Sequence, residues 1–235
     1  GQINGTNLLD NMQPQSNKIY IGYDSRHPIA SSVCEYSLRK HSKDLDIELL
    51  KLSDLEQLYW REYKDQSTEF TYTRFLVPYL QDYNGWALFC DDDFLFLKDV
   101  TKIFKYADDK YAVMCCQHDY TPRAITKMLG KKQIPYKRKN WSSLMLINCG
   151  HESVKKLDLS TVSEQSGRYL HQFKWLKDDE IGSIPRHWNW LVNWYKETDE
   201  DKPSALHFTE GGPWIVNSEY KDLWLKYKKQ MENNK

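Results

Sequence analysis

Hydrophobic residues in the first quarter of the chain change their spacing twice. Residues 18–23 form a β-branched and aromatic run that predicts a strand. Over residues 28–41 the apolar and small side chains instead recur on one helical face, and Pro28 suits a first helical turn. Residues 47–52 return to a strand pattern. This strand–helix–strand order predicts a parallel sheet whose loops after the strands carry the ligand.

Short apolar runs separated by polar segments fill the rest of the chain. Residues 71–80 predict a helix that stops or kinks near Pro78. Strands are predicted at 86–90, 94–97, 111–116, 144–148 and 205–208, and a closing amphipathic helix at 219–231. We expect residues 1–17 to be a flexible polar tail and residues 18–235 to form a single α/β domain.

Composition narrows the class of protein. The 33 basic residues balance 33 acidic ones, which argues against a nucleic-acid binder that must neutralise many phosphates. No apolar run approaches the roughly 18–20 residues that span a bilayer, and no signal peptide is evident. Five cysteines without a CxxC pair predict buried free thiols in a reducing compartment. We therefore expect a cytoplasmic protein without a transmembrane segment.

Three consecutive aspartates, Asp91, Asp92 and Asp93, form the most unusual polar segment. They would repel one another strongly unless water or a cation neutralised them. A solvated turn is one interpretation, but apolar runs flank the triplet on both sides. Alternation along an extended segment would point Asp91 and Asp93 the same way and Asp92 the other. Two carboxylates on one side suit Mg²⁺ or Mn²⁺ and could hold an ion that also binds a diphosphate.

A second unusual segment, LHFTEGGPW, begins at Leu206. Its two glycines, Gly211 and Gly212, permit close backbone approach, and the following Pro-Trp pair stiffens the turn. His207 is either a core histidine after a strand or a third metal ligand through a neutral imidazole nitrogen.

Taken in order, these segments resemble the glycosyltransferase family 8-like enzymes of the GT-A fold. The matching motifs are IYIGYDSR, TYTRFLVPYL, WALFCDDDFLFLKDV, SSLMLIN and the late His-x-x-x-Gly-Gly-Pro-Trp, which span about residues 18–214. The resemblance implies a mixed, mostly parallel sheet flanked by helices, with a Rossmann-like nucleotide-binding half. It also implies Mn²⁺ or Mg²⁺ held by Asp91, Asp93 and His207, and a nucleotide-sugar donor, a UDP-sugar above all.

The same resemblance assigns further residues to the donor. Tyr23 and Asp24 would lie near the base, Asp92 near the ribose, and Arg74 near the sugar and phosphates. A structural salt bridge to an aspartate is the alternative for Arg74. Gly211, Gly212 and Trp214 would close over the diphosphate.

Residues 177–180, KDDE, resemble the acidic segment that contacts the donor sugar. Asp178, Asp179 and Glu180 are therefore candidate catalytic residues, although an acidic first helical turn is the alternative for each of them. Trp188, Trp190 and Trp194 could stack on an acceptor sugar or pack in the core. The basic residues 131–139 could attract an anionic acceptor or a membrane surface, form a solvated loop, or act as a lid.

The sequence thus predicts a metal-dependent transferase that moves a hexose to a hydroxyl of a glycan or lipid-linked acceptor. The resemblance implies retention of configuration, by front-face attack or through a carboxylate nucleophile. A peripheral position on a membrane that carries the acceptor is compatible with this prediction. Two alternatives remain, a metal-dependent phosphohydrolase or nucleotidyltransferase and a non-catalytic sugar-binding protein.

Overall fold

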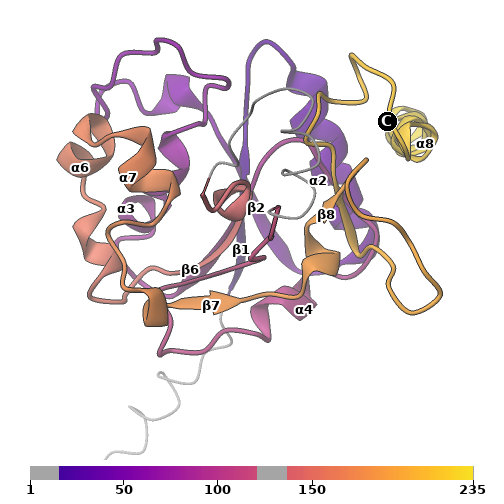
Figure 1. Cartoon of the computed structure of the whole chain (residues 1–235). Coiled ribbons are helices and arrows are strands. Elements are labelled where there is room, and N and C mark those ends of the chain that lie inside the picture. The colour runs from indigo at the N-terminus through magenta and orange to yellow at the C-terminus, as the bar shows by residue number, and fades with distance from the viewer. Residues whose placement is uncertain (1–15, 121–136, 235) are drawn as a thin grey trace, which may run out of the picture.

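The computed structural model describes residues 16–120 and 137–234, which form an α/β fold with two sheets (Figure 1). In this part of the chain a six-stranded sheet has the order β2-β1-β3-β6-β5-β7. Its strands are β1 (Asn17–Gly22), β2 (Leu45–Leu50), β3 (Trp86–Cys90), β5 (Val113–Cys115), β6 (Leu144–Asn148) and β7 (Ile181–Ser183). Only β6 of these six runs antiparallel to its neighbours, which confirms the predicted mixed, mostly parallel sheet.

A smaller sheet continues directly from the larger one. It has the order β4-β9-β8, with β4 (Phe94–Phe96), β9 (Ala205–His207) and β8 (Trp190–Leu191). The aspartate triplet is the whole connection between β3 of the large sheet and β4 of the small one. Because β4 and β9 pair antiparallel with Phe94 opposite His207, the late histidine returns to the side of the triplet.

Helices cover both faces of the large sheet (Figure 1). Helices α3 (Val77–Leu80), α6 (Leu159–Glu164) and α7 (Gly167–His171) lie on one side of it, and α2 (Pro28–His41) lies on the other. Alternation along β1 separates the two cores, since Tyr20 packs in the cluster on the α7 side and Ile21 packs in the cluster that includes α2. Helix α8 (Lys221–Asn233) packs beside α2 through a third cluster that includes the small sheet.

Short helical turns complete the described chain. They are η1 (Leu52–Asp54), η2 (Thr73–Leu76), α4 (Thr101–Phe104), η3 (Trp141–Ser143), η4 (Val154–Lys156), η5 (Asp178–Glu180) and η6 (Arg186–Trp188). The single helix predicted at 71–80 is instead η2 followed by α3. Pro78 does not stop a helix there, because it lies in the first turn of α3, where a missing N–H costs nothing.

The helix at 28–41 and the strands at 86–90 and 144–148 have their predicted bounds. Strand β1 starts at Asn17, so the predicted tail ends one residue earlier; its residues 1–15 lie outside the described chain, as do residues 131–136 of the basic segment. All five cysteines are buried free thiols, as predicted. Across 16–120 and 137–234, no helix has both the length and the apolar character needed to cross a membrane.

Candidate metal centre

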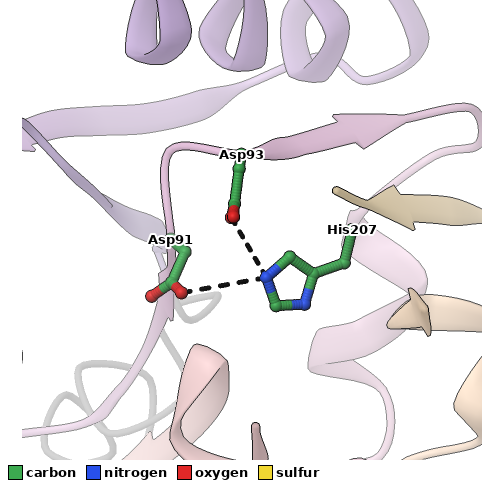
Figure 2. A group of neighbouring side chains, drawn as sticks. All are labelled: Asp91, Asp93 and His207. Carbon is green, nitrogen blue, oxygen red and sulfur yellow. Dashed lines mark ion pairs between the residues drawn. The ribbon is translucent and has the colours of Figure 1, made fainter. Parts of the chain in front are cut away.

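Asp91, Asp93 and His207 converge at the junction of the two sheets (Figure 2). Nε2 of His207 lies 3.1 Å from Oδ1 of Asp93 and 3.8 Å from Oδ2 of Asp91. One ligand atom from each of the three residues lies within 4.8 Å of the others. The local backbone fixes this approach, since the amide of Asp91 donates to the carbonyl of Ser143 and the amide of Phe208 donates to the carbonyl of Asp93.

A chain of hydrogen bonds determines which nitrogen of His207 faces the carboxylates. Oγ of Ser143 donates its only proton to the carbonyl of Asn140 at 2.6 Å, so it accepts from Nδ2 of Asn189 at 2.9 Å. Oδ1 of Asn189 therefore accepts from Nδ1 of His207 at 2.8 Å. With the proton of the neutral ring on Nδ1, the lone pair of Nε2 points at Asp91 and Asp93.

Packing holds the imidazole in this orientation. The ring of His207 is stacked on Phe94, with centroids 4.3 Å apart and planes 17° apart. His207 and Asn189 are both buried, at 1% and 0% exposure. The side chain is thus fixed by a stacked ring on its face and a buried amide behind it.

The donor set fits a divalent cation. Oδ1 of Asp93 is buried and has no hydrogen-bond partner, although the lone pair of His207 lies opposite it. An orphaned carboxylate oxygen facing an imidazole lone pair is unfavourable unless a proton or a cation lies between them. Two carboxylates and one imidazole are ligands that Mn²⁺ and Mg²⁺ accept.

Burial and mutual charge shift the pKa values of the ligands. Burial, together with the charge of Asp93, raises the pKa of Asp91 to about 6 despite the nearby guanidinium of Arg74. Burial would lower the pKa of His207, but the carboxylates of Asp93 and Asp91 outweigh it and raise that pKa. Protons therefore compete with a metal ion for these ligands.

Asp92 is not part of this cluster and is 6% exposed. Burial and the charges of Asp93 and Asp91 raise its pKa to about 9, which favours the protonated carboxyl group as long as no cation is bound nearby. A neutral carboxyl group can donate a hydrogen bond as well as accept one.

Arg74 forms the salt bridge that was the structural alternative for this residue. Its Nη1 donates to Oδ1 of Asp91 at 2.7 Å and to the carbonyl of Ser142 at 2.9 Å. The guanidinium lies over the rings of Phe70 and Phe89, so Arg74 is only 5% exposed. It nevertheless lines the pocket beside Asp91 and can contact a ligand there.

Tyr23 and Asp24 follow β1 at the carboxyl edge of the sheet, but the carboxylate of Asp24 is occupied. It accepts from the amide and Nε of Arg26 at 3.0 and 2.9 Å, from Nη2 of Arg26 at 2.6 Å, and from the amide of Glu69 at 3.4 Å. Burial alone would raise the pKa of Asp24, but the bonds to Arg26 lower it overall. This environment gives Asp24 a role in shaping the loop, and leaves Tyr23, with Lys51 4.8 Å from its ring centroid, as the more accessible residue.

The glycine loop after His207 is shaped for tight packing. Gly211 has φ of +100°, which favours glycine, and a Cβ on Gly212 would lie 2.2 Å from the ring of Trp214. Trp214 packs against Trp224 and His27, with ring centroids 5.8 and 6.0 Å apart.

The structure does not bring Asp178, Asp179 and Glu180 to the metal cluster. They form η5, which leads into the amino end of β7, whereas Asp91 follows the carboxyl end of β3. Since β3 and β7 run in the same direction, the two acidic segments lie at opposite edges of the sheet. The three residues are thus not part of the metal cluster, and their catalytic role stays a prediction.

Two of these acidic residues pair with other groups of the described chain instead. Glu180 accepts from the amide of Lys177 at 2.9 Å and from Oγ of Ser153 at 2.5 Å, and Asp178 pairs with Arg138 at 2.7 Å. This is the acidic helical turn that the sequence left as the alternative. Of the three tryptophans considered for an acceptor, Trp188 and Trp190 are core residues with at most 1% exposure.

Sequence reasoning missed the polar residues behind the site. Asn189 and His171 lie in segments with no recognised motif, and Ser142 and Ser143 begin the SSLMLIN motif but were given no role. Oγ of Ser142 lies 2.7 Å from Nδ1 of His171. One signal was available, because Asn189 is a lone amide between two tryptophans that are both buried. A buried amide needs hydrogen-bond partners, which pointed to a polar site nearby.

A mostly parallel sheet with carboxylates after its third strand and a small second sheet defines the GT-A class of folds. The glycosyltransferase GlyE of Streptococcus pneumoniae TIGR4 shares it with a TM-score of 0.61 and 16% identity over 93% of this chain and 62% of GlyE, so this chain spans less than two thirds of GlyE. The galactosyltransferase LgtC, in complex with donor and acceptor sugar analogues, has a TM-score of 0.61 at 10% identity over 91% and 95% of the two chains. Mouse xyloside xylosyltransferase 1 has a TM-score of 0.54. At these identities the likeness concerns the fold.

No family model matches this sequence. The chain is 48% identical over 218 residues to Protein CDI of Arabidopsis thaliana, which covers 88% of this chain and 84% of that protein. It therefore belongs to the family of Protein CDI. Membership of glycosyltransferase family 8 stays a prediction.

Proposed function

We propose that this protein is a metal-dependent glycosyltransferase that moves a hexose from a UDP-sugar to a hydroxyl of a glycan or lipid-linked acceptor. One observation carries the proposal: a half-buried Asp–Asp–His cluster at the carboxyl edge of β3, in a fold that glycosyltransferases share. The carboxyl edge of a mostly parallel sheet is where such folds bind nucleotides.

In this proposal Asp91, Asp93 and His207 hold Mn²⁺ or Mg²⁺. A bound divalent ion supplies Lewis-acid stabilisation of the charge that develops on a departing nucleoside diphosphate. Arg74 keeps Asp91 ionised and turned toward His207 through the 2.7 Å ion pair. Tyr23 contacts the base, Asp92 contacts the ribose, and the loop of Gly211, Gly212 and Trp214 closes over the phosphates.

The pocket beside Asp91 supports front-face attack over a carboxylate nucleophile. Among described residues its lining contains one carboxylate, Asp91, which is already paired with Arg74 and belongs to the metal cluster. The acidic segment at 178–180 contributes no side chain to the described lining of this pocket. A retaining reaction would then rely on an oxygen of the leaving phosphate as the base.

A donor screen tests this function directly. Release of UDP, GDP or CMP from nucleotide sugars is measured with Mn²⁺ and after chelation, and titration calorimetry measures binding of UDP with and without Mn²⁺. We expect metal-dependent binding of UDP that is lost in Asp93→Ala. The control Asp54→Ala removes an exposed carboxylate that is not part of the metal cluster, and it should leave UDP binding unchanged.

The alternatives give different results in the same assays. Hydrolysis of a generic phosphoester without preference for UDP would favour a phosphohydrolase. Glycan binding that ignores both metal and nucleotide would favour a sugar-binding protein. UDP binding that is unchanged in Asp93→Ala would refute the metal assignment.

A further inference from the structure

A polar pocket of about 230 Å³ lies beside Asp91. Its described lining is rich in hydroxyl groups and cations and includes Ser67, Thr71, Arg74, Asp91, Arg138, Lys139, Asn140, Ser142, Ser143 and His171. The aspartate is the member it shares with the metal cluster. A ligand held at the cluster can therefore extend into this pocket.

The charges around the cluster leave a diphosphate without enough countercharge. A divalent ion there would already be neutralised by the carboxylates of Asp91 and Asp93. The loop at 208–216, which follows His207, contains no lysine or arginine. Two phosphate groups bound at this point need further cations, because buried or half-buried negative charge is costly when unpaired.

Two of the three cations that line the pocket are already engaged. Arg74 donates to Asp91 and to the carbonyl of Ser142. Arg138 pairs with Asp178 at 2.7 Å and donates to the carbonyl of Gln172 at 2.6 Å. Neither guanidinium can turn fully toward a new anion without losing those partners.

Lys139 differs from both arginines. Within the described chain Lys139 forms no ion pair, and its ammonium group lies over two aromatic rings. Nζ lies 5.5 Å from the ring centroid of Tyr120 and 5.9 Å from that of Trp194, and these two rings meet edge to face at 4.9 Å. Aromatic faces attract an ammonium group without cancelling its charge, so they hold it ready for an anion.

The turn that carries Lys139 is fixed from both sides. Arg138 and Asn140 have φ of +56° and +64°, a left-handed conformation that needs support in residues other than glycine. Asn140 supplies that support, because its side chain donates to the hydroxyl of Tyr120 and its carbonyl accepts from Ser143. The same carbonyl ends the hydrogen-bond chain that orients His207, so Lys139 is adjacent in sequence to the anchor of the metal site.

We propose that Lys139 binds the phosphate of the nucleoside diphosphate that is farther from the nucleoside. This assignment rests on the proposed function. Lys139 supplies the basic contact that the glycine loop lacks, and the ring pair of Tyr120 and Trp194 positions it. An ammonium–phosphate hydrogen bond at this place stabilises the leaving group as its charge develops.

Titration calorimetry with UDP, GDP, UMP and inorganic pyrophosphate in the presence of Mn²⁺ tests the proposal. We expect Lys139→Gln to weaken binding of the diphosphates and of pyrophosphate about tenfold, and to leave UMP binding unchanged. Lys139→Arg should retain most of the affinity, because it keeps the charge. Lys137→Gln is the matched control, since it removes an exposed lysine of the same turn. Circular dichroism and the Tm check that each variant is folded.

The outcomes distinguish a failure of the proposed function from a failure of the Lys139 assignment alone. Wild-type protein that binds no nucleoside diphosphate with Mn²⁺ would overturn the proposed function and this assignment together. Wild-type binding that Lys139→Gln leaves unchanged would overturn only the role of Lys139. Equal weakening of UMP and UDP binding in Lys139→Gln would show that Lys139 does not act on the phosphate farther from the nucleoside and would overturn the phosphate assignment.

Discussion

Nδ1 of His207 donates to Oδ1 of Asn189 across 2.8 Å, and this one bond decides that Nε2 faces the two aspartates. Removing it should therefore impair metal binding although Asn189 is not among the three ligands. We expect Asn189→Leu to weaken Mn²⁺ binding about 10- to 100-fold, the usual cost of losing such a supporting contact. Calorimetric titration of Mn²⁺ measures this, with Asn233→Ala as an exposed control. Unchanged affinity in Asn189→Leu would show that packing on Phe94 alone orients the imidazole.

Arg74 and Asp91 form a nearly buried ion pair at 2.7 Å, and breaking it leaves a carboxylate in a crowded acidic site. We expect Arg74→Met to lower the free energy of unfolding by about 3 kcal/mol in metal-free protein. Saturating Mn²⁺ should restore part of this loss, because the ion takes over the neutralisation of Asp91. Urea denaturation with and without Mn²⁺ gives both values. An equal loss in the two conditions would argue that the ion does not contact Asp91.

His171 makes stability depend on pH in a defined direction. Burial, with a contribution from Arg74, lowers the pKa of His171 to about 3, while the unfolded chain titrates near 6.5. The unfolded state therefore binds a proton that the folded state refuses, and stability falls as pH falls from about 6.5 toward 3. The share of His171 between pH 7 and pH 5 is at most about 2 kcal/mol.

Comparison of the wild type with His171→Asn isolates this contribution. Urea denaturation at pH 7 and at pH 5 should show a smaller pH-dependent loss in the variant. The groups around Asp91 titrate in both proteins and cancel in the difference. Identical pH-dependent losses in the two proteins would mean that His171 binds its proton equally well in the folded and the unfolded state.

Gly212 has no room for a side chain. A Cβ there would lie 2.2–2.3 Å from three ring atoms of Trp214, so Gly212→Ala must displace either the ring or the loop. We expect a loss of about 1–3 kcal/mol in the free energy of unfolding and a shift in tryptophan fluorescence. Adding Trp214→Leu should remove the clash, so the double variant should lose little more than Trp214→Leu alone. Additive losses would place the strain elsewhere in the loop.

The local sequence pattern was enough to predict the bounds of elements whose buried positions recur regularly. Strand β3 is apolar at every position because both of its faces are covered, and α2 carries its small and apolar residues on one face, so the bounds of both were predictable. Strand β7 contains a glycine, and β8 is two residues long, so neither shows a period that sequence reasoning can detect.

The site also contains residues that the sequence could predict and residues that it could not. Asp91, Asp93 and His207 stand out because charged or titratable residues interrupt apolar runs. Asp178, Asp179 and Glu180 looked equally distinctive, but which end of a strand a segment adjoins depends on strand direction, and that is a property of the whole sheet. The hydrogen-bond partners of Asn189 are His207 and Ser143, which lie 18 and 46 residues away from it along the chain. No local sequence pattern contains such a relationship.

The metal cluster also takes its ligands from both sides of the three-residue connection between β3 and β4. Asp91 ends the large sheet, Asp93 begins the small one, and His207 comes from a strand near the end of the chain (Figure 2). A bound ion would thus cross-link the two sheets. Metal binding would therefore stabilise the junction of the two sheets as well as hold a ligand there.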